Sequence, residues 1–264
     1  RGFLAGLSLF ADLPPETLDE LTARAEVLAL AGGTSLFDQD TASDALLVLR
    51  WGRLAAWRKE EDGQTRLLGQ ISPGECVGEV GLILNQPRSA TVFALRDSEL
   101  VSWSRSEFEQ LIAHHPAAML RLTREELKRY AASAHRPSGV RCIALLPGTP
   151  GVDAGAFAQR LAQALPWLGR ARVVGADEAR SRGAGWFSRL EQEARGLIYV
   201  GDRDPAWRDR CERQSDAVLV LADTDDKPSH ALPLPQARSP HLPLHLVLLR
   251  REAPMPGSTR AWLD

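Results

Sequence analysis

The chain has 264 residues, which is too long for one small domain and comfortable for two, because domains commonly run about 100 to 150 residues. Hydrophobic residues make up 44% and charged residues 25%, a globular composition that excludes disorder, collagen-like repeats and coiled coil for the whole chain. The formal net charge of -2 argues against non-specific nucleic-acid binding, which needs an excess of Lys and Arg. Three widely spaced cysteines fit buried thiols in a reducing compartment better than a disulfide framework or a zinc site.

The N-terminal residues predict a short helix ahead of the first strand. Asp12 can cap a helix, and Pro14-Pro15-Glu16 places proline in the first turn, where it is tolerated. Leu18, Leu21 and Ala25 then continue an apolar stripe at helical spacing. We therefore expect a helix that packs through this stripe.

From Val27 to Ser104 the pattern changes to short apolar runs separated by turn residues such as Gly32-Gly33, Asp62-Gly63 and Pro73-Gly74. The predicted strands are 27–30, 35–37, 45–49, 53–57, 66–71, 91–94 and 100–103. Short strands at even spacing are typical of a small antiparallel barrel or sandwich.

Two helices are expected to follow the last of these strands. Ser104 and Glu107 have the spacing of a capping box, and a longer helix is predicted from 116 to about 132. The predicted apolar faces are Phe108, Leu111 and Ile112 on the first helix and Leu120, Thr123, Leu127 and Tyr130 on the second. His114-His115 invites a metal interpretation, but helix neighbours point about 100° apart, so we predict no metal site.

The most informative segment runs from Val77 to Thr91. It follows a glycine turn, can form one helical turn, and ends in Pro-Arg-Ser-Ala ahead of a strand. Gly78 lets the backbone approach a ligand closely, Arg88 can meet a phosphate, and Ser89 can donate a hydrogen bond. Glu79 is an acceptor suited to sugar hydroxyls, so the segment points to a ligand with phosphate and ribose.

Gly78-Glu79 and Pro87-Arg88-Ser89-Ala90-Thr91 resemble the two ends of the phosphate-binding cassette of cyclic nucleotide-binding domains. Further positions between about residues 8 and 132 agree: Leu9, Phe10, Leu13, Gly33, Phe37, Asp40, Leu49, Gly52 and Gly74. Two positions depart from the family pattern. Gln39 stands where a glycine usually precedes the aspartate, and Val77 replaces a common aromatic residue.

The resemblance implies a domain over residues 1–135, a β-roll (a jelly-roll-like barrel with flanking helices) of α+β class. It implies that Glu79 accepts from the ribose 2'-OH, that Arg88 and the backbone of Gly78 and Ser89 hold the cyclic phosphate, and that the last helix covers the base. The implied ligand-binding residues are Gly78, Glu79, Val80, Arg88, Ser89 and Ala90. A degenerate domain that keeps the barrel without a ligand is the alternative, and Ser89 does not decide between cAMP and cGMP.

From Val140 onward, strands alternate with helices, which indicates an α/β domain over residues 139–264 with a mainly parallel, Rossmann-like sheet. The predicted strands are 141–146, 172–174, 196–200, 217–222 and 244–249, and the predicted helices are 154–165, 186–194 and 204–213. His135 to Ser138 is the predicted linker, and the proline-rich stretch from Pro228 to Pro243 is a predicted surface loop.

Nucleotide binding and catalysis have little support in this second domain. Gly148-Thr149-Pro150-Gly151 suggests a phosphate loop, but no Lys lies between Lys128 and Lys227 to contact the phosphates. Asp223, Asp225 and Asp226 could hold Mg²⁺, yet a solvated acidic turn is the better interpretation without that Lys. No G-x-S-x-G nucleophile elbow occurs, so no catalytic residue is assigned.

The second domain resembles the regulatory part of bacterial patatin-like phospholipases related to neuropathy target esterase. The segments that carry this resemblance are Ile143-Ala144-Leu145-Leu146-Pro147, Phe157-Ala158-Gln159-Arg160-Leu161-Ala162, Asp216-Ala217-Val218-Leu219-Val220 and Gly257-Ser258-Thr259-Arg260-Ala261-Trp262-Leu263-Asp264. In such proteins a patatin catalytic domain with a Ser-Asp dyad would follow in the same polypeptide. The chain also lacks an initiator Met, which favours its being part of a larger protein.

The leading hypothesis is a cyclic-nucleotide-responsive regulatory region of a serine ester hydrolase that acts on phospholipid or lysophospholipid. The cyclic nucleotide is then a regulatory ligand and no cofactor is expected. The expected location is the cytoplasm, with peripheral association at the inner face of the membrane left open. The alternative is a transcription regulator of the catabolite-activator type, which would need a helix-turn-helix after the first domain. An NTPase with a nucleotide sensor fails mainly on the missing Lys.

Overall fold

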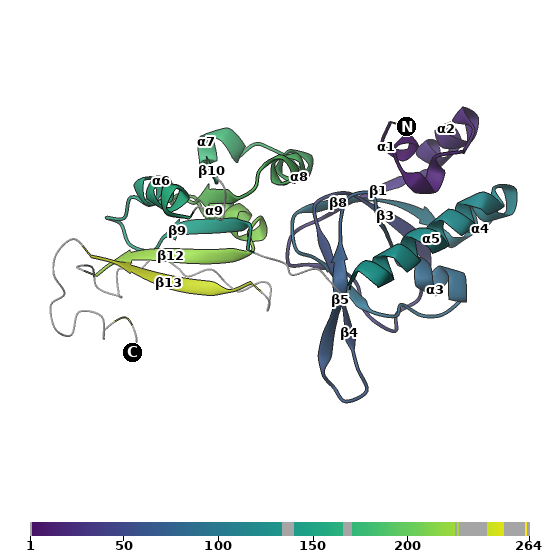
Figure 1. Cartoon of the computed structure of the whole chain (residues 1–264), viewed down its shortest axis with the longest axis horizontal. Helices are drawn as coiled ribbons and strands as arrows, with labels where there is room; N and C mark the ends of the chain where they lie inside the picture. Colours follow the sequence, from purple (N-terminus) through teal and green to yellow (C-terminus); the bar gives the residue numbers. More distant parts are fainter. Residues whose placement is uncertain are drawn as a thin grey trace. The chain divides into compact units, whose positions relative to one another are not determined.

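The computed structural model describes residues 2–133, 140–165, 171–224 and 242–250, together with Asp226 and Trp262 (Figure 1). The chain divides into two compact units, Arg1–Ser138 (unit 1) and Gly139–Asp264 (unit 2). The predicted linker from His135 to Ser138 lies outside the described residues, as does most of the predicted loop from Pro228 to Pro243.

Unit 1 begins with three short helices that cover one side of its strands. They are α1 (Gly2–Ala5), the 3-10 helix η1 (Ser8–Phe10) and α2 (Pro15–Arg24). The helix predicted from the Pro14-Pro15 pair is confirmed as α2, and its Leu18 and Leu21 are buried. Asp12 was expected to cap this helix, and that was wrong: the residue before α2 is Pro14, no side chain caps it, and Asp12 pairs instead with Arg121.

Two four-stranded antiparallel sheets form the β-roll of unit 1, in the orders β1-β8-β3-β6 and β2-β7-β4-β5. Their strands are β1 (Glu26–Leu30), β2 (Ser35–Phe37), β3 (Ala45–Trp51), β4 (Leu54–Lys59), β5 (Thr65–Ile71), β6 (Cys76–Val77), β7 (Thr91–Ala94) and β8 (Ser98–Ser104). All seven predicted strands are present, with ends within two residues of the prediction. Strand β6 was missed, because two residues are too few to show an alternating pattern.

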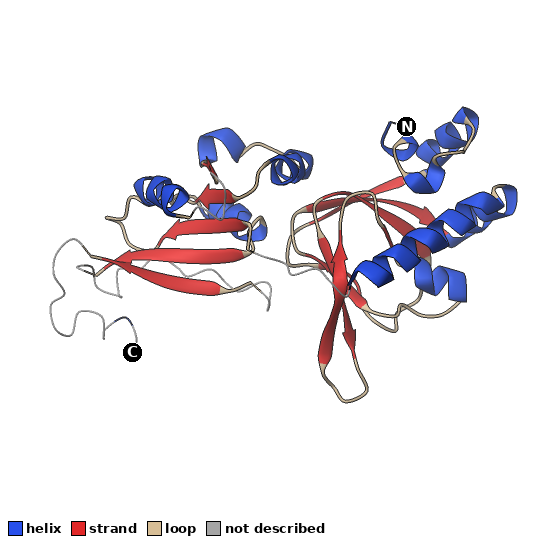
Figure 2. Ribbon diagram, viewed as in Figure 1, coloured by secondary structure: helices blue, strands red, loops and turns tan. Residues whose placement is uncertain are grey.

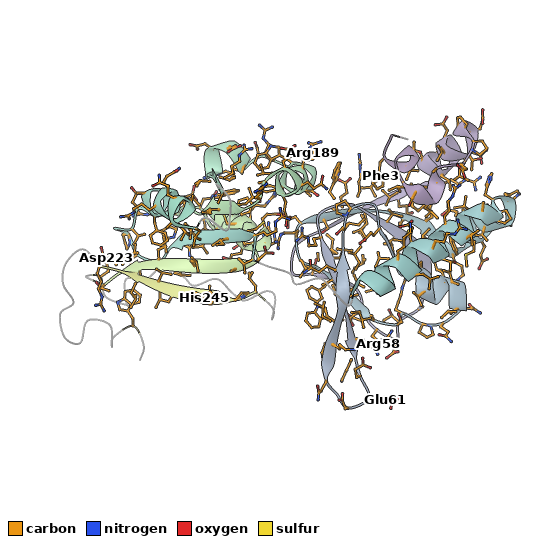
Figure 3. The ribbon with its side chains drawn as sticks, viewed as in Figure 1. Phe3, Arg58, Glu61, Arg189, Asp223 and His245 are labelled. Carbon is orange, nitrogen blue, oxygen red and sulfur yellow. The ribbon has the colours of Figure 1, made fainter. Side chains whose placement is uncertain are left out.

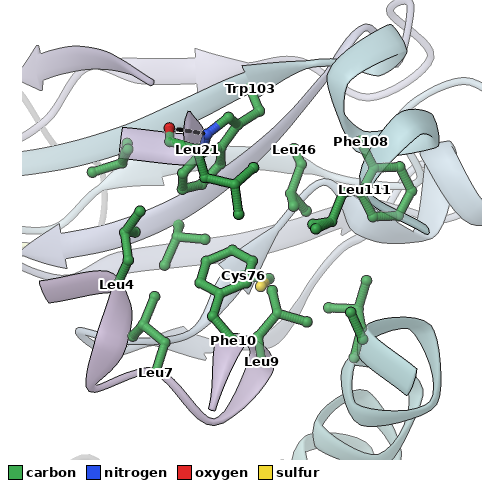
Figure 4. Packing of buried hydrophobic residues seen from close by; sticks show 14 of the residues in the cluster. Leu4, Leu7, Leu9, Phe10, Leu21, Leu46, Cys76, Trp103, Phe108 and Leu111 are labelled. Carbon is green, nitrogen blue, oxygen red and sulfur yellow. Dashed lines mark hydrogen bonds between the residues drawn. The ribbon is translucent and has the colours of Figure 1, made fainter. Parts of the chain in front are cut away.

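Buried apolar side chains fill the roll and the space between the roll and its helices. One cluster includes Leu49, Leu54 and Leu100 inside the roll. In the other, Phe10 meets Trp103 edge to face at a centroid distance of 5.7 Å, and the Trp103 indole donates to the Leu21 carbonyl at 2.9 Å (Figure 4). That hydrogen bond satisfies the only polar atom of a buried indole side chain, as such burial requires.

Two helices follow the roll, α4 (Arg105–His114) and α5 (Pro116–Ser133). The capping box at the start of α4 is confirmed: the Ser104 amide donates to the Glu107 carboxylate at 2.7 Å, and the Glu107 amide donates to the Ser104 hydroxyl at 3.3 Å. Phe108 and Leu111 of α4 are buried as predicted.

The predicted apolar face of α5 is wrong. Leu120 and Leu127 are 53% and 63% exposed, whereas Ala118 and Leu122, one turn apart, are buried. The predicted stripe followed Leu120, Thr123 and Leu127, whereas the buried face is marked by Leu122 and the small residue Ala118. The side chain of Tyr130, the fourth predicted position, lies outside the described residues.

Unit 2 is a parallel five-stranded sheet in the order β10-β11-β9-β12-β13, which confirms the predicted α/β class (Figure 2). Its strands are β9 (Cys142–Pro147), β10 (Arg172–Val174), β11 (Leu197–Val200), β12 (Ala217–Asp223) and β13 (Leu244–Leu249). Its helices are α6 (Ala154–Ala164), α7 (Ala176–Ala179), α8 (Ala184–Glu193) and α9 (Pro205–Arg213). Alternate residues of β9 pack on opposite faces, with α6 on one face and α7, α8 and α9 on the other.

The three cysteines, Cys76, Cys142 and Cys211, are buried and not disulfide-bonded, as predicted. Burial raises the pKa of the Cys211 thiol well above its usual range, because the thiolate would be desolvated. None of the helices in the described parts of the two units is both long and apolar enough to cross a bilayer.

Candidate functional site

The segment from Val77 to Thr91 forms a turn, a short helix and a return to the sheet. Gly78 has φ +83° and leads directly from β6 into the helix α3 (Glu79–Leu84). Asn85, with φ 52°, ends that helix in the left-handed region. Glycine is required at position 78 for two reasons: its φ is unfavourable for L side chains, and a Cβ there would overlap the guanidinium of Arg88.

Arg88 is the centre of the site. Its side chain is only 3% exposed, and the guanidinium lies 4.2 Å from the centroid of the Phe37 ring. Nη1 donates to the Gly78 carbonyl at 2.9 Å, and Nη2 donates to the Ala45 carbonyl at 3.1 Å. Nη2 also pairs with the Asp44 carboxylate at 3.3 Å. These contacts fix the plane of the guanidinium and hold it against the backbone turn at Gly78.

The guanidinium of Arg88 is desolvated, and two nearby carboxylates offset part of that cost. Burial lowers the pKa of Arg88 below its ordinary value, and the nearby Asp44 and Glu79 carboxylates oppose that effect. The Asp44 side chain is 83% exposed, so solvent weakens its contribution. Nε of Arg88 is buried and has no hydrogen-bond partner among the described residues. Arginine stays protonated in proteins, so the site holds a buried cation with one unused N–H donor.

Glu79 lies on the same turn, as the first residue of α3, and is 1% exposed. Its carboxylate is close enough to act on the charge of Arg88. A buried carboxylate beside a buried guanidinium gives the site an acceptor as well as donors, which suits a ligand with both an anionic group and hydroxyls.

The other three predicted ligand-binding residues differ in burial. Ala90 is buried, whereas Val80 and Ser89 are exposed. The structure therefore brings Gly78, Glu79 and Arg88 together in contact, with the Ser89 side chain at the surface beside them.

The sequence did not reveal three residues that contact the Arg88 guanidinium: Phe37, Asp44 and Ala45. Asp44 lies 44 positions away along the chain, and the Ala45 contribution is a carbonyl, which no residue type reveals. Phe37 was noted only as a position matching the family, although its ring stacks on the guanidinium. The pairing of β-roll strands brings these groups together, and no local motif marks them.

The suspected phosphate loop of unit 2 follows β9 and is closed by internal hydrogen bonds. Thr149 is fully buried, and its hydroxyl oxygen accepts from the Asp223 amide at 3.1 Å. Asp153 caps α6 by accepting from the Ala156 amide at 2.9 Å, so a carboxylate already occupies the start of that helix. A carboxylate at this position repels phosphate, and the loop groups are used within the fold. Asp225 of the suspected acidic site lies outside the described residues.

Two protein-family models match the chain, one within each unit. Residues 27–115 match the family described as "Cyclic nucleotide-binding domain". Residues 139–264 match the family described as "Neuropathy Target Esterase family P-loop like domain".

Curated relatives are much longer than this chain. Lysophospholipase NTE1 of Candida albicans is 28% identical in an alignment 236 residues long, which covers 75% of this chain and 17% of that protein. Patatin-like phospholipase domain-containing protein 7 of Mus musculus is 25% identical in an alignment 276 residues long, which covers 90% of this chain and 20% of that protein. The chain thus spans about a fifth of the length of these relatives.

Among solved structures, the crystal structure of Thermus thermophilus Catabolite Activator Protein is similar over 48% of this chain and 59% of that chain. The identity is 28% and the TM-score is 0.43.

Proposed function

Because the chain joins a cyclic nucleotide-binding domain to a Neuropathy Target Esterase family P-loop like domain, we propose that it is the cyclic-nucleotide-responsive regulatory region of a patatin-like phospholipase or lysophospholipase. The printed names of the relatives, a lysophospholipase and a patatin-like phospholipase domain-containing protein, support the class of the parent protein. No residue of this chain is assigned to catalysis. The hydrolytic residues would lie in a patatin domain of the same polypeptide.

The observation that carries the ligand proposal is the buried, incompletely paired guanidinium of Arg88. Arg88 would bind the cyclic phosphate together with the backbone of Gly78 and Ser89. Glu79 would accept a hydrogen bond from the ribose 2'-OH, and Val80 and Ala90 would line the same site. Binding would be favourable because the negative phosphate would pair with the Arg88 guanidinium, whose desolvation cost is already incurred on folding.

Regulation would run through α5, the last helix of unit 1. A ligand can shift an equilibrium only as far as it binds two states differently. We propose that the nucleotide favours one position of α5 over the roll, and that unit 2 transmits this preference to the catalytic domain. The side chains of Leu120 and Leu127 support this, because they are 53% and 63% exposed on one face of α5.

The proposed location is the cytoplasm, since three buried cysteines that form no disulfide favour a reducing compartment. A lipid substrate would bring the catalytic part to the membrane surface, so the association would be peripheral.

A transcription regulator of the catabolite-activator type is the weaker candidate. Such a protein needs a recognition helix for the major groove after its nucleotide domain. In the described part of unit 2, a parallel sheet with helices on both faces occupies that place. Only the first unit is common to both candidates.

Isothermal titration of the whole chain with cAMP, cGMP and the open-chain 5'-AMP tests the ligand proposal and decides the cyclic nucleotide. Wild type is expected to bind one or both cyclic compounds, and Arg88→Ala neither. Arg96→Ala is the matched control, because Arg96 is equally buried but lies next to Arg53, at the opposite end of β4 from Arg58 and Lys59. Absence of heat with both cyclic nucleotides in wild type would contradict the proposal.

A further inference from the structure

Gln39 forms a reciprocal pair of hydrogen bonds with the end of β4. Its Oε1 accepts from the Lys59 amide at 2.8 Å, and its Nε2 donates to the Lys59 carbonyl at 3.2 Å. The Gln39 amide donates to the Thr91 hydroxyl at 3.0 Å. The Gln39 side chain thus hydrogen-bonds to Lys59, two residues beyond Trp57, the last β4 residue paired with β7. Together with the Gln39 backbone amide, it ties the turn after β2 to both β4 and β7.

This arrangement explains why the family's usual glycine is dispensable here. The positive φ in this turn is at Asp40, with φ 67°, and not at Gln39. Position 39 therefore has no backbone need for glycine, and the amide side chain is free to make the contacts with Lys59.

The turn that Gln39 anchors holds the backbone of Arg88 on both sides. The Asp40 amide donates to the Arg88 carbonyl at 2.9 Å, and the Arg88 amide donates to the Thr41 carbonyl at 2.8 Å. Asp40 and Thr41 immediately follow Gln39, so a movement of the turn would move the Cα of Arg88.

Arg58, the residue before Lys59, reaches the same segment from β4. Its Nε donates to the Ser89 carbonyl at 3.0 Å. Figure 3 labels Arg58 on the hairpin formed by β4 and β5, with Glu61 further along it. One end of β4 is therefore linked to the segment carrying Arg88 in two ways: through Gln39 and the turn that bonds to the Arg88 backbone, and through Arg58, which bonds to Ser89.

We propose that Gln39 and Arg58 are positioning residues that clamp the segment carrying Arg88 and thereby set its affinity for the phosphate of a cyclic nucleotide. This inference rests on the proposed function. Neither side chain needs to touch the ligand. Their contacts lie at the surface, so losing them returns the Lys59 and Ser89 backbone groups to water and leaves the buried core intact.

The test is calorimetric titration of the whole chain with whichever cyclic nucleotide wild type binds. Gln39→Ala and Arg58→Ala are each expected to weaken affinity by about threefold to tenfold, the effect of one or two net hydrogen bonds. Gln39→Glu keeps the acceptor for the Lys59 amide but loses the donor, and is expected to weaken affinity in the same direction. Arg66→Ala is the matched control, since Arg66 pairs with Glu60 on the same hairpin. The Arg66→Ala variant should bind the nucleotide with wild-type affinity.

A double-mutant cycle separates positioning from general loosening of the fold. The loss from Gln39→Ala should largely disappear in an Arg88→Lys background, because Gln39 acts through Arg88. The same loss should add fully to that of Glu79→Ala, which acts at the ribose.

The outcomes distinguish this inference from the function on which it rests. If wild type binds no cyclic nucleotide, the proposed function fails. If wild type binds and Arg88→Ala does not, but Gln39→Ala, Gln39→Glu and Arg58→Ala all bind like wild type, the clamp alone is overturned. Full additivity of Gln39→Ala with Arg88→Lys would also overturn it.

Discussion

Gly78→Ala should damage both the stability and the ligand site of unit 1, and Gly63→Ala provides the control that separates the causes. Both glycines have nearly the same backbone conformation, with φ +83° and +81°. A Cβ at Gly63 meets nothing within 4 Å, whereas a Cβ at Gly78 overlaps the guanidinium of Arg88. The two positions therefore share the cost of a positive φ, and Gly78→Ala additionally displaces Arg88.

The magnitudes follow from these contacts. Left-handed φ costs an L residue about 1–2 kcal/mol, so Gly63→Ala should lower the free energy of unfolding by that amount. Gly78→Ala should add the loss of the charged hydrogen bond from Arg88 to the Gly78 carbonyl, worth about 1.5–3 kcal/mol. The total for Gly78→Ala is about 2.5–5 kcal/mol. Its affinity for cyclic nucleotide should fall at least about tenfold, while that of Gly63→Ala stays at the wild-type value.

Urea unfolding of unit 1 and calorimetric titration of the whole chain measure the two effects. The reasoning would be refuted if Gly78→Ala cost no more stability than Gly63→Ala. Equal nucleotide affinity in the two variants would refute the placement of the ligand beside Gly78 and Arg88.

Three further changes test other parts of the structure. Asp44→Ala should strengthen nucleotide affinity by no more than about tenfold, because it removes a carboxylate that competes for Arg88 but is 83% exposed and screened; a loss of affinity would contradict this. Leu122→Ala should lower the free energy of unfolding by about 2–5 kcal/mol and Leu127→Ala by at most about 0.5 kcal/mol, since only the first is buried; urea unfolding with the reverse order would show that α5 packs through the other face. Thr149→Val should cost about 1–3 kcal/mol by leaving the Asp223 amide without its acceptor, and Mg-ATP should not raise the melting temperature of wild type; ATP stabilisation would reopen the phosphate-loop hypothesis.

The sequence was most informative where short-range chemistry decides structure. Glycine and proline turns bounded the strands of the β-roll, and the Ser104–Glu107 spacing located the start of α4. The left-handed turn at Gly78 and the helix after it could also be predicted, because only local backbone conformation is involved.

Features that depend on strand pairing or on close packing were not predictable in the same way. Two groups that contact the Arg88 guanidinium come from separate strands: the Phe37 ring from β2 and the Ala45 carbonyl from the start of β3. The face of α5 was misjudged because the small residue Ala118 contributes little to an apolar pattern yet lies on the buried face of that helix. Gln39 was noted as a departure from the family, but its bonds to Lys59 became visible only once β4 was placed beside it.

The most direct test of the central claim is the side-chain Nε–H resonance of Arg88 in ¹H–¹⁵N NMR spectra, assigned by its loss in Arg88→Lys. This donor is buried and has no hydrogen-bond partner among the described residues. If Arg88 receives the cyclic phosphate, its resonance should shift strongly on saturation with the cyclic nucleotide, while those of Arg66 and Arg96 stay in place. An unchanged Arg88 resonance in a chain that calorimetry shows to be saturated would contradict the claim.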